Sequence, residues 1–140
     1  MATGESIPAT LRLSLTGPQA VHAATSCARD FAALQEIDSA AAARLAIAVE
    51  ELVTNLYEHG GLGADDAIEL SLSRSADAVS LTITDQGMPF DPRSAEQSPA
   101  VPERGGGAGL ALVRAWASES DYEVGEKGNR LTISLPLDRR

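Results

Sequence analysis

Three polar residues that could hold a metal ion recur at a regular spacing in one stretch of the sequence. Glu51, Asn55 and His59 follow one another at intervals of four residues. On a helix they form one stripe, beside an apolar ridge that contains Leu52 and Leu56. A carboxylate and an amide oxygen at the border between core and solvent are hard donors of the kind that Mg²⁺ accepts, together with phosphate and water. The stripe therefore predicts a magnesium site, and the alternative is a solvated polar face in which His59 caps the helix end.

A second candidate site is the segment from Gly105 to Gly109, in which four of five residues are glycine. It leads directly into an apolar, helix-forming segment that begins at Leu110. Glycine lets backbone N–H groups approach a ligand closely, and the first turn of a helix offers unpaired donors and the positive end of the helix dipole. The segment predicts a phosphate-binding helix start. A flexible loop that happens to precede a helix is the alternative.

A third candidate is Asp85 with Gly87, at the end of a predicted strand. Asp85 follows an apolar run, where an ionised carboxylate needs a hydrogen-bond donor to offset its desolvation. Gly87 allows the chain to turn and a ligand edge to approach the backbone. The alternative is an aspartate that caps the turn through its own backbone. Four of the seven prolines then fall within residues 86–104, which favours a long lid or binding loop.

Hydrophobic periodicity predicts the elements that position these residues. Strands are expected where apolar residues alternate, and helices where they recur at helical spacing. Strands joined in hairpins, with helices covering one apolar face, predict an α+β fold: a two-layer α/β sandwich with a mixed, mostly antiparallel sheet covered on one face by three helices. The expected strands are 9–15, 67–74, 78–84, 121–124 and 131–137, and the expected helices are 19–34, 39–58 and 110–117.

Composition narrows the class of protein. A chain of 140 residues with 44% hydrophobic residues fits a short tail over residues 1–8 and one globular domain over residues 9–140. The net charge of −9 argues against binding to nucleic acid or to an anionic membrane surface. The sequence shows no leader pattern and no long apolar run, and it has one cysteine, Cys27, so a cytoplasmic location is expected.

Taken together and in this order, the motifs resemble the ATPase domain shared by gyrase, heat-shock protein 90, histidine kinases and MutL, the GHKL superfamily with its Bergerat ATP-binding fold. Within it, the sequence most resembles the anti-sigma factor serine/threonine kinases of the RsbW type. The resemblance spans residues 9–137. It is carried by Glu51-Leu52-Val53-Thr54-Asn55 with His59-Gly60, by Asp85-Gln86-Gly87-Met88-Pro89-Phe90-Asp91-Pro92, and by the segment from Gly105 to Val113.

The resemblance implies roles for individual residues. Asn55 matches the asparagine that coordinates Mg²⁺ on the phosphates, and Glu51 matches the proposed general base for the attacking hydroxyl. Asp85 matches the aspartate that accepts a hydrogen bond from the adenine amino group. The implied ATP-binding residues are Asn55, His59, Asp85, Gly87, Pro89, Phe90, Arg104, Gly105, Gly106, Gly107, Ala108, Gly109 and Leu110. In the first helix, Arg29 is the candidate for an arginine that binds a partner.

The function implied is that of a Mg²⁺- and ATP-dependent protein serine kinase. Its substrate would be an anti-anti-sigma antagonist with a STAS domain, and it would sequester a sigma factor or another output protein, as a homodimer. The alternative is a nucleotide-bound module that sequesters its partner with little catalysis. The presence of Glu51 favours the kinase, because a pure binding module has no use for a base at that position. A histidine-kinase catalytic domain and a MutL-like clamp fit less well, since a dimerisation helix and a second domain are absent from this sequence.

Overall fold

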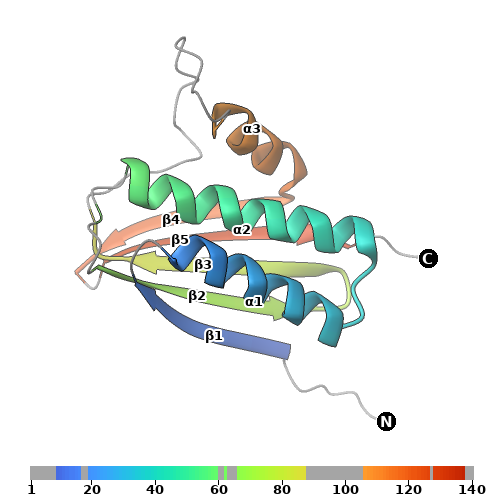
Figure 1. Ribbon diagram of the computed structural model, residues 1–140. Helices are drawn as coiled ribbons and strands as arrows, with labels where there is room; N and C mark the ends of the chain where they lie inside the picture. The colour runs from blue at the N-terminus through green and yellow to red at the C-terminus, as the bar shows by residue number, and fades with distance from the viewer. Residues whose placement is uncertain are drawn as a thin grey trace.

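The computed structural model describes residues 9–16, 19–59, 62, 66–87, 106–126 and 128–137, with the backbone alone described in the first strand, at residue 59 and in the first turn of the third helix. Within these described residues, five strands and three helices follow one another (Figure 1). Their order is β1 (Ala9–Thr16), α1 (Ala20–Leu34), α2 (Ser39–His59), β2 (Ala67–Arg74), β3 (Ala78–Asp85), α3 (Gly106–Trp116), β4 (Glu119–Gly125) and β5 (Gly128–Pro136).

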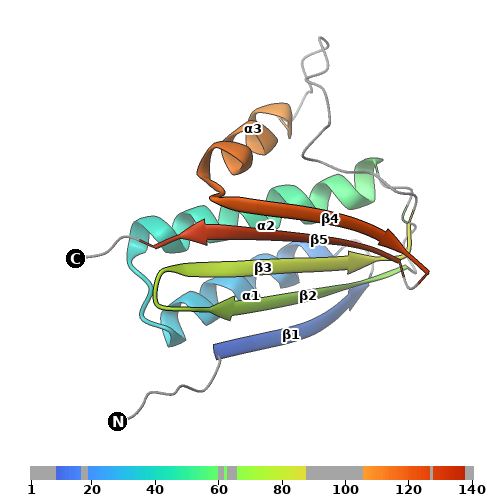
Figure 2. The same ribbon diagram turned by 180° about the vertical axis from the view of Figure 1, so that it is seen from behind.

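The strands form one sheet in the order β1-β2-β3-β5-β4, seen in Figure 2 from the face opposite α1 and α2. The predicted α+β class is confirmed, but the expected mixture of strand directions is not found, because all four pairings among the described strands are antiparallel. Two hairpins impose antiparallel neighbours within β2–β3 and β4–β5. The strand pairing that connects the two hairpins is also antiparallel, because β5 and not β4 pairs with β3. β4 runs in the same direction as β3, so a β3–β4 pairing would have been parallel.

The helices α1 and α2 cover one face of the sheet, and α2 lies between α1 and α3, with contacts to both (Figure 1). The predicted apolar ridge of α2 is buried, with Leu45, Val49, Leu52 and Leu56 each at most 8% exposed. The alternating apolar residues of β2, β3 and β5 face the helices and complete an aliphatic core. Burial of this contiguous apolar surface is the main driving force for the fold.

One predicted core position is wrong. Apolar residues at helical spacing from Val21 to Leu34 predict that Leu34 packs inward with the rest of that helix face, yet its side chain is 80% exposed. It is the last residue of α1, and the side chains that pack inward at this end of the helix are those of Phe31 and Ala32. Helical spacing identified the face, but it could not determine where along that face the packing stops.

The turn between α1 and α2 is held by contacts within the chain. Glu36 adopts a left-handed backbone conformation, with φ of 55°, and the Ile37 N–H donates to the Ala32 carbonyl at 2.9 Å. This is the pattern of a helix C-terminus that reverses direction. The guanidinium of Arg74, from the end of β2, donates to the Gln35 carbonyl. Asp38 is the N-cap of α2, because its carboxylate accepts the Ala41 N–H at 3.2 Å.

The third helix begins earlier than the apolar spacing predicts. The sequence placed its start after the glycines, at Leu110, whereas α3 begins at Gly106. The glycines therefore form the first turn of the helix. Packing of α3 against α2, with Val113 buried at 2% exposure, outweighs the poor helix propensity of glycine. Among the described helices, none is long and apolar enough to cross a membrane.

Candidate functional site

Asn55 is a buried amide on the inward face of α2. Its side chain is 5% exposed, and it lies among apolar neighbours one turn from the end of the helix. Its Nδ2 donates to the Glu51 carbonyl at 3.4 Å, which is a long contact. Within the described part of the chain, its Oδ1 is buried without a hydrogen-bond partner. A buried polar oxygen without a partner is costly and native proteins rarely retain one, so this atom needs a functional explanation.

Asp85, the last residue of β3, is a second buried polar group, with 4% of its side chain exposed. Its Oδ1 accepts the Gly87 N–H at 2.8 Å and the Asn129 Nδ2 at 3.1 Å. The first of these contacts is the turn cap that the sequence left open as an alternative to ligand binding. It does not exclude a ligand, because the contacts that the described residues make with the carboxylate both fall on Oδ1.

Asn129 completes this arrangement and was not expected from the sequence. Its side chain is 2% exposed, and its Nδ2 also donates to the Gly87 carbonyl at 2.9 Å. Asn129 lies directly opposite Asp85 in the register of β3 with β5. The preceding Gly128 has φ of 119°, and a Cβ at this position would overlap the Asp85 carbonyl oxygen. The only local signal was a Gly-Asn pair before an alternating strand, which by itself indicates a turn.

Asn55, Asp85 and Asn129 are the buried polar residues of the described chain, and we call them the polar end of the core. They come from element ends that meet at the same end of the molecule (Figure 1). The Tyr57 hydroxyl donates to the Asp66 carbonyl at 2.9 Å, which ties the last turn of α2 to the start of β2. Ile68, near that start, pairs with Asp85. The sheet and the second helix therefore bring together polar groups that are distant in the sequence.

The other predicted site residues are placed as follows. Glu51 lies one turn before Asn55 and is half-buried, whereas its neighbour Glu50 is exposed. His59 is the last residue of α2. The backbone of Gly106, Gly107, Ala108, Gly109 and Leu110 forms the first turn of α3, which runs antiparallel to α2 in Figure 1. Pro89, Phe90, Arg104 and Gly105 lie outside the described residues.

The donor set at the polar end of the core fits a magnesium–nucleotide complex. Asn55 Oδ1 is a hard oxygen, and Mg²⁺ is commonly bound through one or two protein oxygens plus substrate phosphates. The described residues contain no group of three His, Cys, Asp or Glu side chains arranged to hold a metal ion. A nucleotide-bound magnesium needs no such group, because the phosphates supply the remaining ligands.

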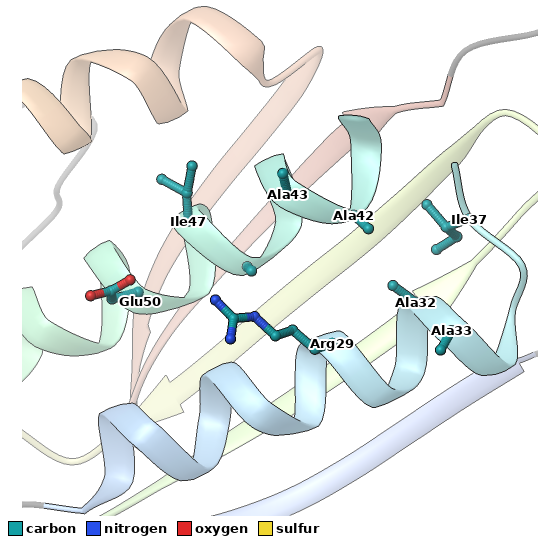
Figure 3. Close-up of a pocket in the computed structure, with 9 residues that line it drawn as sticks. Arg29, Ala32, Ala33, Ile37, Ala42, Ala43, Ile47 and Glu50 are labelled. Carbon is teal, nitrogen blue, oxygen red and sulfur yellow. The ribbon is translucent and has the colours of Figure 1, made fainter. Parts of the chain in front are cut away.

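A separate groove of about 410 Å³ lies between α1 and α2 (Figure 3). Arg29 and Glu50 lie at its sides, and alanine and isoleucine side chains form most of its wall. Its lining residues are distinct from those at the polar end of the core. Arg29, the candidate for a partner-binding arginine, therefore lies on a different surface from the candidate nucleotide site. Cys27, on the same helix as Arg29, is half-buried, and burial together with the nearby Asp30 raises the pKa of its thiol.

Residues 16–135 match the histidine kinase-like ATPase domain family, so the chain belongs to this family. The match covers α1, α2, the glycine-rich helix start and every strand that contributes to the polar end of the core. The predicted superfamily is therefore confirmed. A comparison with functionally curated proteins gave no match.

Solved structures with a similar fold agree with this assignment. The crystal structure of the RsbU and RsbW domains of Rv1364c from Mycobacterium tuberculosis aligns with a TM-score of 0.65 and 21% identity, over 94% of this chain and 33% of that one. The blue-light activated histidine kinase EL346 of Erythrobacter litoralis aligns with a TM-score of 0.52 and 23% identity, over 72% of this chain and 32% of that one. The chain thus spans about a third of the length of these proteins. Both likenesses show a shared fold.

Proposed function

We propose that this protein is a Mg²⁺- and ATP-dependent protein serine kinase of a partner-switching system. It phosphorylates an anti-anti-sigma antagonist with a STAS domain, and it sequesters a sigma factor or another output protein when the antagonist is not available. The observation that carries the proposal is the polar end of the core. There, Asn55 keeps a buried oxygen without a partner among the described residues, and Asp85 has one carboxylate oxygen held by two donors. Membership of an ATPase family supports a nucleotide as the ligand.

Asp85 recognises the base in this proposal. Its carboxylate accepts the amino group of adenine, a charge-assisted hydrogen bond that contributes about 1.5–3 kcal/mol in a site shielded from water. Guanine presents a carbonyl oxygen at the corresponding position, which the carboxylate repels. The Asp85 side chain is already desolvated and oriented before the nucleotide arrives, because it is 4% exposed and fixed by two donors. This preorganisation reduces the cost of binding.

Asn55 and the glycine-rich start of α3 hold the phosphates. Asn55 Oδ1 supplies the protein oxygen for Mg²⁺, and the ion neutralises negative charge on the transferred phosphoryl group when it is bound. The first turn of α3 offers backbone N–H groups and the positive end of a helix dipole to the triphosphate. Arg104, just before the glycines, is proposed to reach the terminal phosphate.

Glu51 positions the attacking hydroxyl. It lies one helical turn from Asn55, so it is close to a proposed phosphate-binding residue. Its side chain is half-buried, so it remains partly accessible to a substrate. It accepts the proton of the antagonist's serine hydroxyl as that oxygen bonds to the terminal phosphorus. The bond from phosphorus to the bridging oxygen of ADP breaks in the same transfer. Phosphoryl transfer depends mostly on such positioning and on charge neutralisation.

The remaining parts of the proposal follow from the resemblance and the composition. The protein acts as a homodimer in the cytoplasm, and its net charge of −9 favours protein partners over nucleic acid or membrane. The second candidate function is a nucleotide-bound module that sequesters its partner without catalysis. Glu51 favours the kinase, because sequestration alone requires no proton acceptor beside the phosphates.

The test is transfer of labelled phosphate from ATP to the STAS-domain antagonist encoded near this gene, with nucleotide affinity measured on the same preparations. We expect phosphoserine on the antagonist with the native chain. We expect loss of at least about a hundredfold in transfer rate for Glu51→Ala, with ATP affinity kept, because a positioned base contributes about that factor. Glu50→Gln is the matched control on the same helix, and its exposed side chain predicts rates within about twofold of native.

The outcomes separate the two candidate functions. Transfer that persists unchanged in Glu51→Ala would refute the role of this residue. ATP binding without any transfer by the native chain would favour the sequestering module.

A further inference from the structure

We infer that Asn129 is a positioning residue for adenine recognition, and that it acts through Asp85 rather than on the nucleotide itself. The inference rests on the proposed ATP site and names a residue that the sequence motifs did not identify. Asn129 Nδ2 donates to Asp85 Oδ1 at 3.1 Å and to the Gly87 carbonyl at 2.9 Å.

These two contacts fix the orientation of the Asn129 amide. An amide nitrogen carries two hydrogens, and each has an acceptor here. The reversed orientation would place the amide oxygen against a carboxylate and a carbonyl, where three acceptors would face one another. The side chain is 2% exposed, so water cannot relieve such a conflict. Asn129 is therefore held in one state.

The same contacts fix the Asp85 carboxylate. Its Oδ1 accepts two donors that come from different segments of the chain, the Gly87 N–H at 2.8 Å and the Asn129 Nδ2 at 3.1 Å. Rotation of the carboxylate would break at least one of them. Oδ2 is consequently the oxygen directed to an incoming amino group. In this arrangement Asn129 determines which carboxylate oxygen meets the base and how it is aimed.

The start of β5 is itself held against the Asp85 turn. Asn129 is the register partner of Asp85, and Gly128 has a positive φ that lets the backbone pass close to the Asp85 carbonyl. Any side chain at Gly128 would push the strand away from this carbonyl. Three features of β5 therefore serve one arrangement: a glycine that permits close approach, a register that places an amide opposite the carboxylate, and the amide itself.

A purely structural role for Asn129 would tie two strand ends together without affecting base recognition. The two roles differ in one measurable property. If Asn129 aims Asp85 at the adenine amino group, then removing the amide weakens only nucleotides that carry this group. If Asn129 merely stabilises the strands, then all purine nucleotides lose affinity to the same extent.

The experiment measures dissociation constants of the full-length chain for ATP and for purine riboside triphosphate, which lacks the exocyclic amino group. For Asn129→Ala we expect ATP affinity to fall about tenfold, the size of a weakened hydrogen bond to a charged group, and purine riboside triphosphate affinity to change less than about twofold. Asn129→Ser, which retains one donor in a smaller side chain, covers the case in which the alanine variant does not fold. Its ATP affinity should lie between the affinities of the native chain and of the alanine variant.

Two reference variants complete the design. Asp85→Ala removes the proposed acceptor, so it should abolish the preference for ATP over the analogue. Thr132→Ala removes another side-chain contact between the same two strands, the 3.3 Å hydrogen bond between the Thr82 and Thr132 hydroxyls, and should leave both affinities unchanged.

Equal losses for the two nucleotides, or no loss in Asn129→Ala, would overturn the inference while the proposed function stands. Failure of the native chain to bind ATP would overturn both.

Discussion

The two ends of the molecule use their polar groups differently. At one end lie the β2–β3 hairpin and the connection from α1 to α2 (Figure 1). Polar groups there bind the chain itself: Arg74 donates to the end of α1, the Ser75 N–H donates to the Ala78 carbonyl at 2.8 Å, and the Leu137 N–H donates to the Asp77 carbonyl at 2.8 Å. Turns and caps account for these contacts.

At the other end, the polar groups are more deeply buried and less completely paired. Asn55, Asp85 and Asn129 are all at most 5% exposed, and Asn55 Oδ1 has no partner among the described residues. A fold gains nothing by burying an amide oxygen in this way, since the unpaired group costs about 1–3 kcal/mol. The difference between the ends teaches that polar groups at one end close the fold, whereas those at the other end are available for the ligand that we propose.

The largest expected effect comes from Asn55, whose replacement should convert the proposed ligand-binding end into one that only stabilises the fold. For Asn55→Leu we expect Mg²⁺-dependent ATP affinity to fall at least about tenfold, because the proposed metal ligand is removed. We also expect a rise of about 1 kcal/mol in the free energy of unfolding without ligand, because an unpaired buried oxygen is replaced by an apolar group. Nucleotide titration and urea denaturation check the two parts.

Asn55→Asp is the matched control, since it keeps an oxygen ligand. It should retain Mg²⁺-dependent binding and should not gain stability. A fall in stability of Asn55→Leu comparable to that of an ordinary core substitution would show that the amide is structural, and the contrast between the ends would fail.

The next effect concerns the end that closes the fold. Asp38→Ala removes the carboxylate that accepts the Ala41 N–H and leaves the first turn of α2 uncapped. The expected cost is about 1 kcal/mol in the free energy of unfolding, with ATP affinity unchanged. Ser39→Ala is the control at the neighbouring exposed position and should be nearly neutral. Chemical denaturation of both variants measures the free energy of unfolding. An equal loss of stability in the two variants would show that Asp38 is not the capping residue.

The smallest effect concerns Glu36, which has a left-handed backbone at the end of α1. A side chain in this conformation is strained, whereas glycine adopts it without steric cost. Glu36→Gly should therefore raise the free energy of unfolding by about 0.5 kcal/mol. The relief of backbone strain stabilises the folded state, and the greater conformational entropy of glycine in the unfolded chain offsets part of this gain. Glu36→Ala, which keeps the strain, should give no increase. If both variants were more stable than the native chain, the gain would come from removal of the Glu36 charge and not from relief of backbone strain.

Much of the fold could be predicted from the sequence. The bounds of α1, α2, β2 and β3 agree with the predicted ranges within a residue or so, because alternation and helical spacing are local properties that each segment carries. The start of α3 was misplaced, since glycines disfavour a helix in isolation and only packing on α2 makes them helical. The exposure of Leu34 was missed for a related reason, because the extent of a buried face depends on what covers it.

The candidate site was predictable in part. Asp85 and Asn55 could be named because their types and positions within local motifs indicate ligand chemistry, and the structure buries both. Their roles in ATP binding, like those of Glu51 and of the glycines, stay predictions. Asn129 could not be named, because its importance comes from its pairing with a residue 44 positions away.

By itself, the sequence determined the elements, the apolar faces and the chemical types of the candidate residues, since these depend on neighbours within one or two turns or strand repeats. Tertiary structure decided which strand stands beside β3, which amide faces Asp85 and which buried oxygen has no partner. The physical reason is that strand order and burial are set by the free energy of the whole core. The Asn129 contact that helps to orient the Asp85 carboxylate exists only after β5 has docked between β3 and β4.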